Sequence, residues 1–263
     1  KILASLSIIG VVAAIAVGAT VAFLHDTETS TGNILIAGTM DLTVDHLFAS
    51  YNDNPCEEYC ELDETVNLVT NGGFETPLVT HSTKWDIFPS VAGNWTVEWR
   101  SDIPATWGIY TRPSPANLEL HRGVNGWIVY EGSQYAELDT DWNGHTSAPN
   151  GEPASVKIYQ DIATTPGKQY QLKFAFSPRP GTTAAQNKLE IKWEGVSLGI
   201  VGNVPGGGNT NWTVYTYNVT ASDDSSRLEF IDKGTANSEG TFLDAVKLHP
   251  YECEYRIIGG TCK

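Results

Sequence analysis

One short segment of the 263-residue chain has the residue types and spacing of a calcium-binding loop. Asp139, Asp141 and Asn143 alternate ahead of Gly144, which is the Asp-x-Asp-x-Asn-Gly opening of such loops, and Ca²⁺ prefers oxygen donors of this kind. The rest of the pattern is missing, because its twelfth position is Asn150 rather than Glu. A plain β-turn made of short polar residues and glycine is therefore the alternative to a metal site.

Motifs of known enzyme classes do not assemble into a catalytic site. Residues 195–199 fit the Gly-x-Ser-x-Gly nucleophile elbow, but that motif needs a helix after it, and residues 200–206 cannot begin one. Residues 195–199 therefore predict a hairpin turn instead. Glu137 and Asp139 could serve a glycosidase, yet two carboxylates two residues apart on a strand more often lie on a solvated edge. The sequence therefore predicts a protein that is not an enzyme.

Aromatic content favours a binding role. The chain has 8 Trp and 11 Tyr, and sugar sites place an aromatic face beside hydrogen-bonding side chains. Candidates in loop-like surroundings are Trp107, Tyr110, Arg112 and Trp142, with ordinary loop packing as the alternative for each. The balance of 16 Lys+Arg against 31 Asp+Glu gives a net charge of −15, which argues against nucleic acid as a partner.

The elements that would position these residues are strands. From Asn67 onward apolar residues recur with a period of two, as in residues 170–176 and 188–194, and clusters of Gly and Pro separate the apolar segments. No stretch beyond residue 24 keeps a period of 3.6. Many short strands with such turns predict an all-β fold, an antiparallel sandwich or jelly roll.

Five landmarks in order resemble a galactose-binding-like domain. They are NGGFETP at 71–77, EGSQYAELD at 131–139, QDI with TPG at 160–167, FSPRPG at 176–181 and FLDAV at 242–246. The segment 67–250 is similar to bacterial cell-wall and surface domains of unknown function and to jelly-roll carbohydrate-binding modules. This resemblance implies a fold and a binding habit rather than a reaction.

The same resemblance implies a structural calcium ion. In calcium-containing jelly-roll modules the Glu of the first landmark and the first Asp of the last one meet, and Glu75 and Asp244 match those positions. A solvated strand end for Glu75 and a turn cap for Asp244 are the alternatives. Arg179 matches a recurring Arg of the family, where a ligand contact and a structural hydrogen bond are both open.

The N-terminal segment is neutral and apolar. Residues 2–24 carry no Asp, Glu, Lys or Arg, which is long enough for a membrane-spanning helix. Lys1, the apolar run and the small residues before Phe23 have the order of a secretory signal, with cleavage expected after Ala22. A retained membrane anchor, or the packed helix of a pilus-like filament, is the alternative for residues 1–22.

Residues 23–45 carry a second resemblance. The sequence FLHDTETSTGN followed by the strand-like ILIAGTMDLTVD resembles the N-terminal motif of the camelysin/TasA family of secreted biofilm-matrix proteins. This resemblance implies export, removal of the leader by a dedicated signal peptidase, and assembly into fibres through the strand. An export leader on an unrelated cargo is the alternative.

Four cysteines flank the predicted sandwich in two pairs, Cys56 with Cys60 and Cys253 with Cys262. Export permits disulfides, and both a bridge between the two pairs and local pairing within each remain open. Three glycosylation sequons begin at Asn94, Asn211 and Asn218.

Together these features predict four segments: residues 1–22 as signal or helix, 23–66 as strand and linker, 67–250 as sandwich, and 251–263 as a Cys-containing tail. We expect an exported protein of the cell surface or extracellular matrix that binds a glycan and acts in adhesion, stabilised by calcium. A subunit that polymerises with itself into a fibre or pilus is the alternative function.

Overall fold

A computed structural model describes residues 49–51, 54–91, 93–146, 151–257 and 260–261 of the chain. The chain forms two compact units, residues 1–60 with 253–263, and residues 61–252. The predictions for residues 1–48, which include the leader and the strand that follows it, lie outside the described residues. Within the described ranges, no helix is long and apolar enough to cross a membrane.

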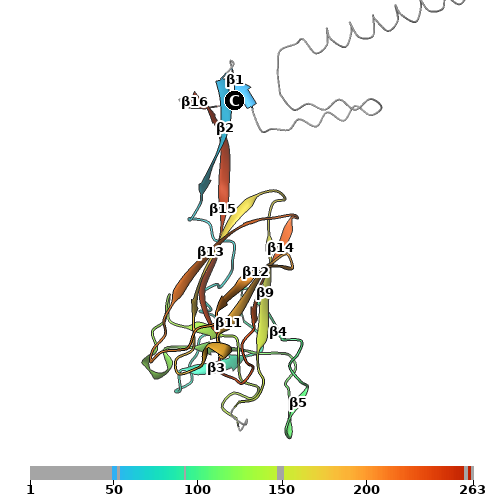
Figure 1. Cartoon of the computed structure of the whole chain (residues 1–263), viewed down its shortest axis with the longest axis vertical. Helices are drawn as coiled ribbons and strands as arrows, with labels where there is room; N and C mark the ends of the chain where they lie inside the picture. The colour runs from blue at the N-terminus through green and yellow to red at the C-terminus, as the bar shows by residue number, and fades with distance from the viewer. Residues whose placement is uncertain (1–48, 52–53, 92, 147–150, 258–259, 262–263) are drawn as a thin grey trace, which may run out of the picture. The chain divides into compact units, whose positions relative to one another are not determined.

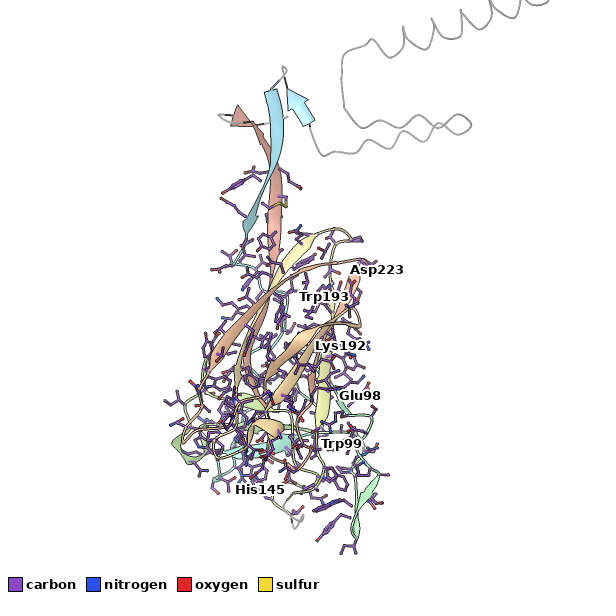
Figure 2. The ribbon with its side chains drawn as sticks, in the orientation of Figure 1. Glu98, Trp99, His145, Lys192, Trp193 and Asp223 are labelled. Atoms are coloured by element: carbon purple, nitrogen blue, oxygen red, sulfur yellow. A yellow bond between two sulfur atoms is a disulfide. The ribbon has the colours of Figure 1, made fainter. Side chains whose placement is uncertain are left out.

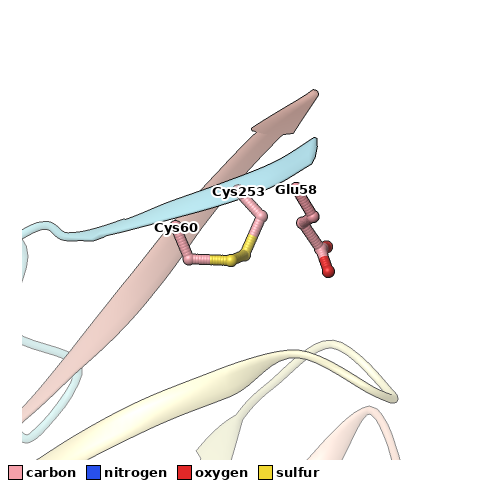
Figure 3. A group of neighbouring side chains, drawn as sticks. All are labelled: Glu58, Cys60 and Cys253. Atoms are coloured by element: carbon pink, nitrogen blue, oxygen red, sulfur yellow. A yellow bond between two sulfur atoms is a disulfide. The ribbon is translucent and has the colours of Figure 1, made fainter. Parts of the chain in front are cut away.

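The smaller unit contains short antiparallel pairings. Strand β1 (Ala49–Tyr51) pairs with β2 (Asn54–Leu62), and β16 (Gly260–Thr261) pairs with the end of β15 (Phe242–Ile257). β2 and β15 are neighbours, and Cys60 and Cys253 form a disulfide between them with their Cα atoms 4.0 Å apart (Figure 3). Of the two pairings that the sequence left open, these two residues show the bridge between the cysteine pairs.

The larger unit contains the two sheets of the sandwich. Its first sheet has the strand order β13-β10-β15-β8-β7-β3, and all of these pairings are antiparallel. Besides β15, its strands are β3 (Trp85–Phe88), β7 (Leu118–His121), β8 (Tyr135–Glu137), β10 (Gln169–Ser177) and β13 (Thr213–Thr220).

The second sheet has the order β12-β11-β14-β9-β4, again antiparallel throughout. Its strands are β4 (Thr96–Trp99), β9 (Val156–Ala163), β11 (Lys188–Trp193), β12 (Val196–Gly202) and β14 (Ser225–Asp232). Figure 1 shows β13 and β15 of the first sheet beside β9, β11 and β14 of the second. A separate hairpin joins β5 (Thr106–Trp107) to β6 (Tyr110–Thr111).

The hydrophobic core lies between the two sheets. Leu120 and Phe174 of the first sheet pack in one buried cluster with Ile158, Ile191 and Phe230 of the second. Along β11 the burial alternates residue by residue, as the period of two requires. The predicted all-β antiparallel sandwich is therefore confirmed.

The nucleophile-elbow sequence begins at Gly195 in the predicted hairpin turn and continues as strand β12 rather than as a helix. β11 ends at Trp193 and β12 begins at Val196, so residues 194 and 195 make the turn. Glu194 and Gly195 both have positive φ values, 49° and 78°, which suits a tight two-residue hairpin.

The outer face of the first sheet is buried along β7 and β8, and this positions the site. Leu118 and Leu120 of β7 and Ala136 of β8 belong to the core between the sheets. Because side chains alternate along a strand, Glu119 and His121 of β7 point to the opposite face. All residues of β7 and β8 are nevertheless buried. The loops contain two short 3₁₀ helices, η1 (Val124–Gly126) and η2 (Ala184–Gln186).

Candidate functional site

A pocket of about 710 Å³ opens on the larger unit. Its lining comes from the start of β3, from β7, from the loops after β7, β8 and β10, and from the loop between β14 and β15. The lining residues are Thr83, Trp85, Glu119, His121, Val124, Asn125, Trp127, Asp141, Gly151, Arg179, Asn237, Ser238 and Glu239. Small-molecule and sugar sites have volumes in this range and combine aromatic walls with a few polar groups.

Two facing carboxylates and a histidine lie at the floor of the pocket. Glu119 of β7 is directly opposite Glu137 of β8, an arrangement that is unfavourable for two negative charges. His121 contacts both, because its Nε2 lies 2.6 Å from Glu119 Oε1 and 2.9 Å from Glu137 Oε2. The imidazolium therefore offsets the repulsion between the two carboxylates.

Arg179 adds a second cation to the floor. The guanidinium Nη1 donates to Glu137 Oε2 at 2.5 Å, and the backbone N–H of Gly240 donates to Glu137 Oε1 at 2.8 Å. The Arg179 backbone is in turn held by Asn187, whose Oδ1 accepts from its N–H at 3.0 Å. Arg179 thus makes structural hydrogen bonds and also lines the pocket, where a ligand could contact it.

The two carboxyl groups of the floor differ in pKa. Burial and the charge of Glu137 raise the pKa of Glu119 to about 7, against the hydrogen bond from His121. Burial would raise the pKa of Glu137 too, but the Arg179 charge and the His121 hydrogen bond hold it below its usual value. Burial disfavours the imidazolium of His121, yet the bonds to Glu119 and Glu137 raise its pKa.

Two polar atoms beneath the pocket lack partners. Among the described residues, neither Nδ1 of His121 nor the hydroxyl of Tyr135 makes a hydrogen bond, although both are buried. Tyr135 packs against His121, with ring centroids 5.5 Å apart, and against Phe242 at 4.8 Å. Such buried polar atoms are costly, and they are common where a site waits for a ligand or water.

Two tryptophans form aromatic walls. The Trp127 ring is nearly parallel to His121, at 6.1 Å and 6°, and the Arg179 guanidinium lies 5.7 Å from its centroid. The Trp85 ring lies 4.0 Å from that of His145, which itself stacks on His81 at 3.6 Å. His145 is labelled in Figure 2 at one end of the sandwich. These packing contacts fix both indoles without burying them fully.

Carboxylates dominate the rim. Asp141 Oδ1 accepts the backbone N–H groups of Asn143 and Gly144 at 2.9 and 2.7 Å. Glu152 is wholly buried behind it, and burial together with the neighbouring Asp141 raises the pKa of Glu152. Within the described ranges, Oε2 of Glu152 has no hydrogen-bond partner. Glu239 is half exposed, and its Oε1 is 3.9 Å from Arg179 Nη2.

Of the aromatic residues predicted to bind sugar, none lines this pocket. Trp142 is 2% exposed and packs with Ile103 and Ala154, so its ring has no face to offer a ligand. Trp107 and Tyr110 of the β5–β6 hairpin pack against the same cluster. The Arg112 guanidinium donates to the Ile103 carbonyl and lies 6.0 Å from the Trp99 ring. These positions match the alternative of loop packing.

The two aspartates of the calcium-loop pattern have separate partners. Asp139 is wholly buried, and its Oδ2 accepts the backbone N–H groups of Asn237 and Glu239 at 2.8 and 3.3 Å. Asp141 caps the turn at Asn143, as expected for the β-turn alternative. The expected solvated edge for Glu137 and Asp139 is wrong, because both side chains are fully buried.

Glu75 and Asp244 do lie close together, beside Gly73. A Cβ atom on Gly73 would be 3.8 Å from Asp244 Oδ1 and 3.9 Å from Glu75 Cγ. The segment 131–134 wraps both: Glu131 N donates to Asp244 at 3.0 Å, and Ser133 N donates to Glu75 at 2.8 Å. Burial raises the pKa of Asp244 to about 7, helped by the charges of Glu131 and Glu75.

Two other groups have the composition of metal sites. Glu119, His121 and Glu137 present ligand atoms within 4.8 Å of one another. However, the Arg179 guanidinium already binds the Glu137 oxygen that faces His121, so a cation there would meet a fixed positive charge. Glu58, Cys60 and Cys253 form the second group, but its sulfur atoms are joined in the disulfide (Figure 3).

The three glycosylation sequons are on the surface. Asn94, Asn211 and Asn218 are all exposed, and Asn218 Oδ1 accepts the Tyr251 hydroxyl at 3.2 Å. Modification of these residues stays a prediction.

Sequence reasoning missed most of the pocket. Glu119 and His121 occupy the polar phase of the alternating Leu118–His121 strand, a pattern that ordinarily indicates a solvated face. The sequence signal that could have identified them is a histidine, His121, two residues after Glu119 on one predicted strand, with Glu137 on another. Trp127 and Glu239 come from loops whose positions depend on the whole fold.

Comparison with known proteins gives similarity of structure only. No family model matches the chain, and no curated protein matches it by sequence. The Stig cyclase Fisc from Fischerella sp. TAU is 15% identical with a TM-score of 0.46, over 73% of this chain and 98% of that one.

Carbohydrate-binding modules are also similar in structure. TmCBM61, solved with β-1,4-galactotriose, is 14% identical with a TM-score of 0.40, over 70% of this chain and 97% of that one. A family 35 module from Clostridium thermocellum is 14% identical with a TM-score of 0.31, over 62% and 90% of the two chains. The structures similar to this chain thus include both enzymes and binding modules.

Proposed function

We propose that the larger unit binds a carbohydrate in the pocket above β7 and β8. The observation that carries this proposal is the presence of two indole walls, Trp85 and Trp127, around a floor of charged groups held by buried partners. Pyranose rings stack on aromatic faces while their hydroxyls bond to fixed polar groups. The polar side chains Asn125, Asn237 and Ser238 complete such a lining.

The test compares two tryptophans. Trp127→Ala removes a pocket wall, and a truncated binding anchor costs about 1.4 kcal/mol or more, which is a tenfold or greater loss of affinity. Trp107→Ala is the matched control, because this half-buried tryptophan of the β5–β6 hairpin packs against the Trp142 cluster and does not line the pocket. Affinity is measured by calorimetry against a panel of oligosaccharides. Equal loss in both variants would contradict the proposal.

The setting that we propose is the cell surface or extracellular matrix, with a role in adhesion. It is supported by the leader-like order of residues 1–22 and by the disulfide Cys60–Cys253, which suits an oxidising compartment. Intact mass and N-terminal sequencing of the native protein test removal of the leader by a signal peptidase. Filaments of the purified protein in electron microscopy would favour the alternative of a fibre subunit.

A binding role is proposed in preference to catalysis because both floor carboxylates are engaged by protein cations. Hydrolysis is the second candidate, and it is favoured by the unequal pKa values of the facing pair Glu119 and Glu137, since acid–base roles require such a difference. Incubating the protein with each oligosaccharide that it binds, and then analysing the products, distinguishes binding from hydrolysis. Cleavage that disappears in Glu119→Gln would establish the enzyme.

A structural Ca²⁺ ion between Glu75 and Asp244 is also proposed. The donor set fits, because both side chains supply hard oxygen atoms and the charges of Glu75 and Glu131 oppose ionisation of Asp244. A divalent cation would offset that repulsion. The ion would have a structural role, because it would join the segment before β3, which carries Glu75, to β15, which carries Asp244.

Thermal unfolding with and without a chelator tests the ion. Free Ca²⁺ at about 100 times its Kd should stabilise the fold by about 2.7 kcal/mol. Asp244→Asn should lose this response, whereas Asp223→Asn, which changes an exposed carboxylate on another loop, should keep it. A melting temperature of the wild type that does not change with chelator would contradict the proposal.

A further inference from the structure

The distribution of charge in the pocket points to the class of sugar. Arg179 is the one Arg or Lys among the described residues that line it. That guanidinium is committed to Glu137, and the imidazolium of His121 is committed to Glu119 and Glu137. The cations of the floor are therefore already paired with carboxyl groups of the protein.

The carboxylates on the rim are not neutralised in this way. Asp141 receives two backbone N–H groups but forms no ion pair among the described residues. The nearest guanidinium nitrogen to Glu239 is 3.9 Å away and belongs to Arg179, which is already paired. The pocket therefore presents negative charge to a ligand.

A buried carboxyl group, that of Glu152, lies next to Asp141 and adds oxygen acceptors to this side of the pocket. Glu152 is fully buried, its Oε1 accepts the Trp142 N–H at 3.1 Å, and its Oε2 has no partner among the described residues. Two adjacent carboxyl groups, one with an unpaired buried oxygen, gain from a positive charge placed beside them.

The walls and the chain as a whole favour the same ligand. The indole ring of Trp85 can attract an ammonium group that approaches its face, whereas Trp127 already has the Arg179 guanidinium beside its ring. The net charge of −15 repels polyanions at a distance. Uronic acid and sulfated glycans are therefore disfavoured.

We propose that the pocket selects a glycan with free amino groups, whose ammonium lies against Asp141 with Glu152 behind it and against Glu239. This inference rests on the proposed carbohydrate binding and names its substrate class. A neutral sugar would satisfy the aromatic walls but would leave the acidic rim without a partner.

Calorimetry with three probes of equal length tests the proposal: a glucosamine oligosaccharide, its N-acetylated form and an oligogalacturonate. At about pH 6 amino groups are charged, and the free-amine probe should bind about tenfold or more tightly than the acetylated one, with the uronate weakest. High salt should reduce the preference.

Conservative variants identify which carboxylates produce the preference for the free-amine probe. Asp141→Asn keeps an oxygen that can accept from the Asn143 and Gly144 N–H groups, so the turn survives while the charge is lost. It and Glu239→Gln should each reduce the preference for the amine several-fold. Asp223→Asn is the control, because Figure 2 places Asp223 at the opposite end of the sandwich from His145, whose ring contacts Trp85.

The outcomes separate this inference from the proposed function. Equal affinity for the amine and its acetylated form, or tighter binding of the uronate, overturns the inference and leaves carbohydrate binding in place. Absence of binding to every glycan overturns both. A rise in melting temperature with CaCl₂ that is lost in Asp141→Asn but kept in Asp244→Asn would show that the rim holds a metal ion, which also overturns the inference.

Discussion

Glu137 and Asp139 are two residues apart and both are completely buried, yet their pKa values shift in opposite directions. Burial would raise the pKa of Glu137, but Arg179 and His121 hold it below its usual value. The pKa of Asp139 is well above its usual value because of burial and the adjacent Asp232. Burial of the same degree is therefore compatible with a lowered pKa at one carboxyl group and a raised pKa at the other.

The surroundings of Asp139 explain the difference. Ser155 Oγ lies 2.5 Å from Asp232 Oδ2 and 3.3 Å from Asp139 Oδ1, so one hydroxyl joins the two acids. Arg100 is the nearest cation and is 3.6 Å from Asp232. Burial raises the pKa of Asp232 to about 6, against the Ser155 and Thr241 hydrogen bonds. A buried carboxyl thus becomes a fixed charge only where a cation is bound directly to it.

Removal of Arg179 should have the largest effect on this comparison. Arg179→Met leaves Glu137 buried with His121 as its one cation, and loss of one partner of a buried pair costs about 3–5 kcal/mol of unfolding free energy. Arg227→Met is the control, because its pair with Asp161 is 41% and 51% exposed and such pairs contribute about 1 kcal/mol or less. Urea unfolding measures both, and similar small losses would show that the Arg179 pair is not a fixed buried charge.

The pH dependence of stability should have opposite sign at the two positions. A raised pKa means that the folded state binds more protons than the unfolded state, so the contribution of Asp139 is present at low pH and is lost as pH rises. The unfolding free energy of the wild type should therefore fall relative to Asp139→Asn between pH 4 and 7, by at most about 1.4 kcal/mol per pH unit.

Glu137→Gln provides the contrast. The lowered pKa of Glu137 gives stability that is present above its usual value and lost as pH falls. The wild type should keep its advantage over Glu137→Gln from about pH 5.5 to 7 and lose it toward acid. Parallel pH profiles of the two variants would contradict the assignment of opposite pKa shifts.

Loss of the hydroxyl between the two acids should have the smallest of these effects. Ser155→Ala leaves Asp139 and Asp232 without their shared donor, and an unsatisfied buried polar group costs about 1–3 kcal/mol. Ser222→Ala is the control, because its hydroxyl bonds to Glu194 at 2.6 Å on the exposed surface, where substitutions stay within about 0.5 kcal/mol. Chemical denaturation distinguishes the two, and equal values would mean that Ser155 does not link the acids.

Prediction of the fold from sequence succeeded where the pattern is local. Period-two alternation in residues 170–176 and 188–194 identified strands whose apolar residues are buried, and Gly195 marked a hairpin. Prediction of the site was weaker. Trp142 and Arg112 looked like loop residues available to a ligand, but the second cluster of buried residues encloses the tryptophan.

The sequence by itself determined the strands, the turns, the acidic surface and the pairs of cysteines, because alternation, turn chemistry, charge and spacing are properties of neighbouring residues. Only the tertiary structure decided that Glu119 faces Glu137 and that Arg179 reaches Glu137 from a distant loop. It also decided which face of β7 lies under the pocket. Those relationships depend on strand register and on loops that cover the outer face of a sheet, and both are set by packing across the whole sandwich.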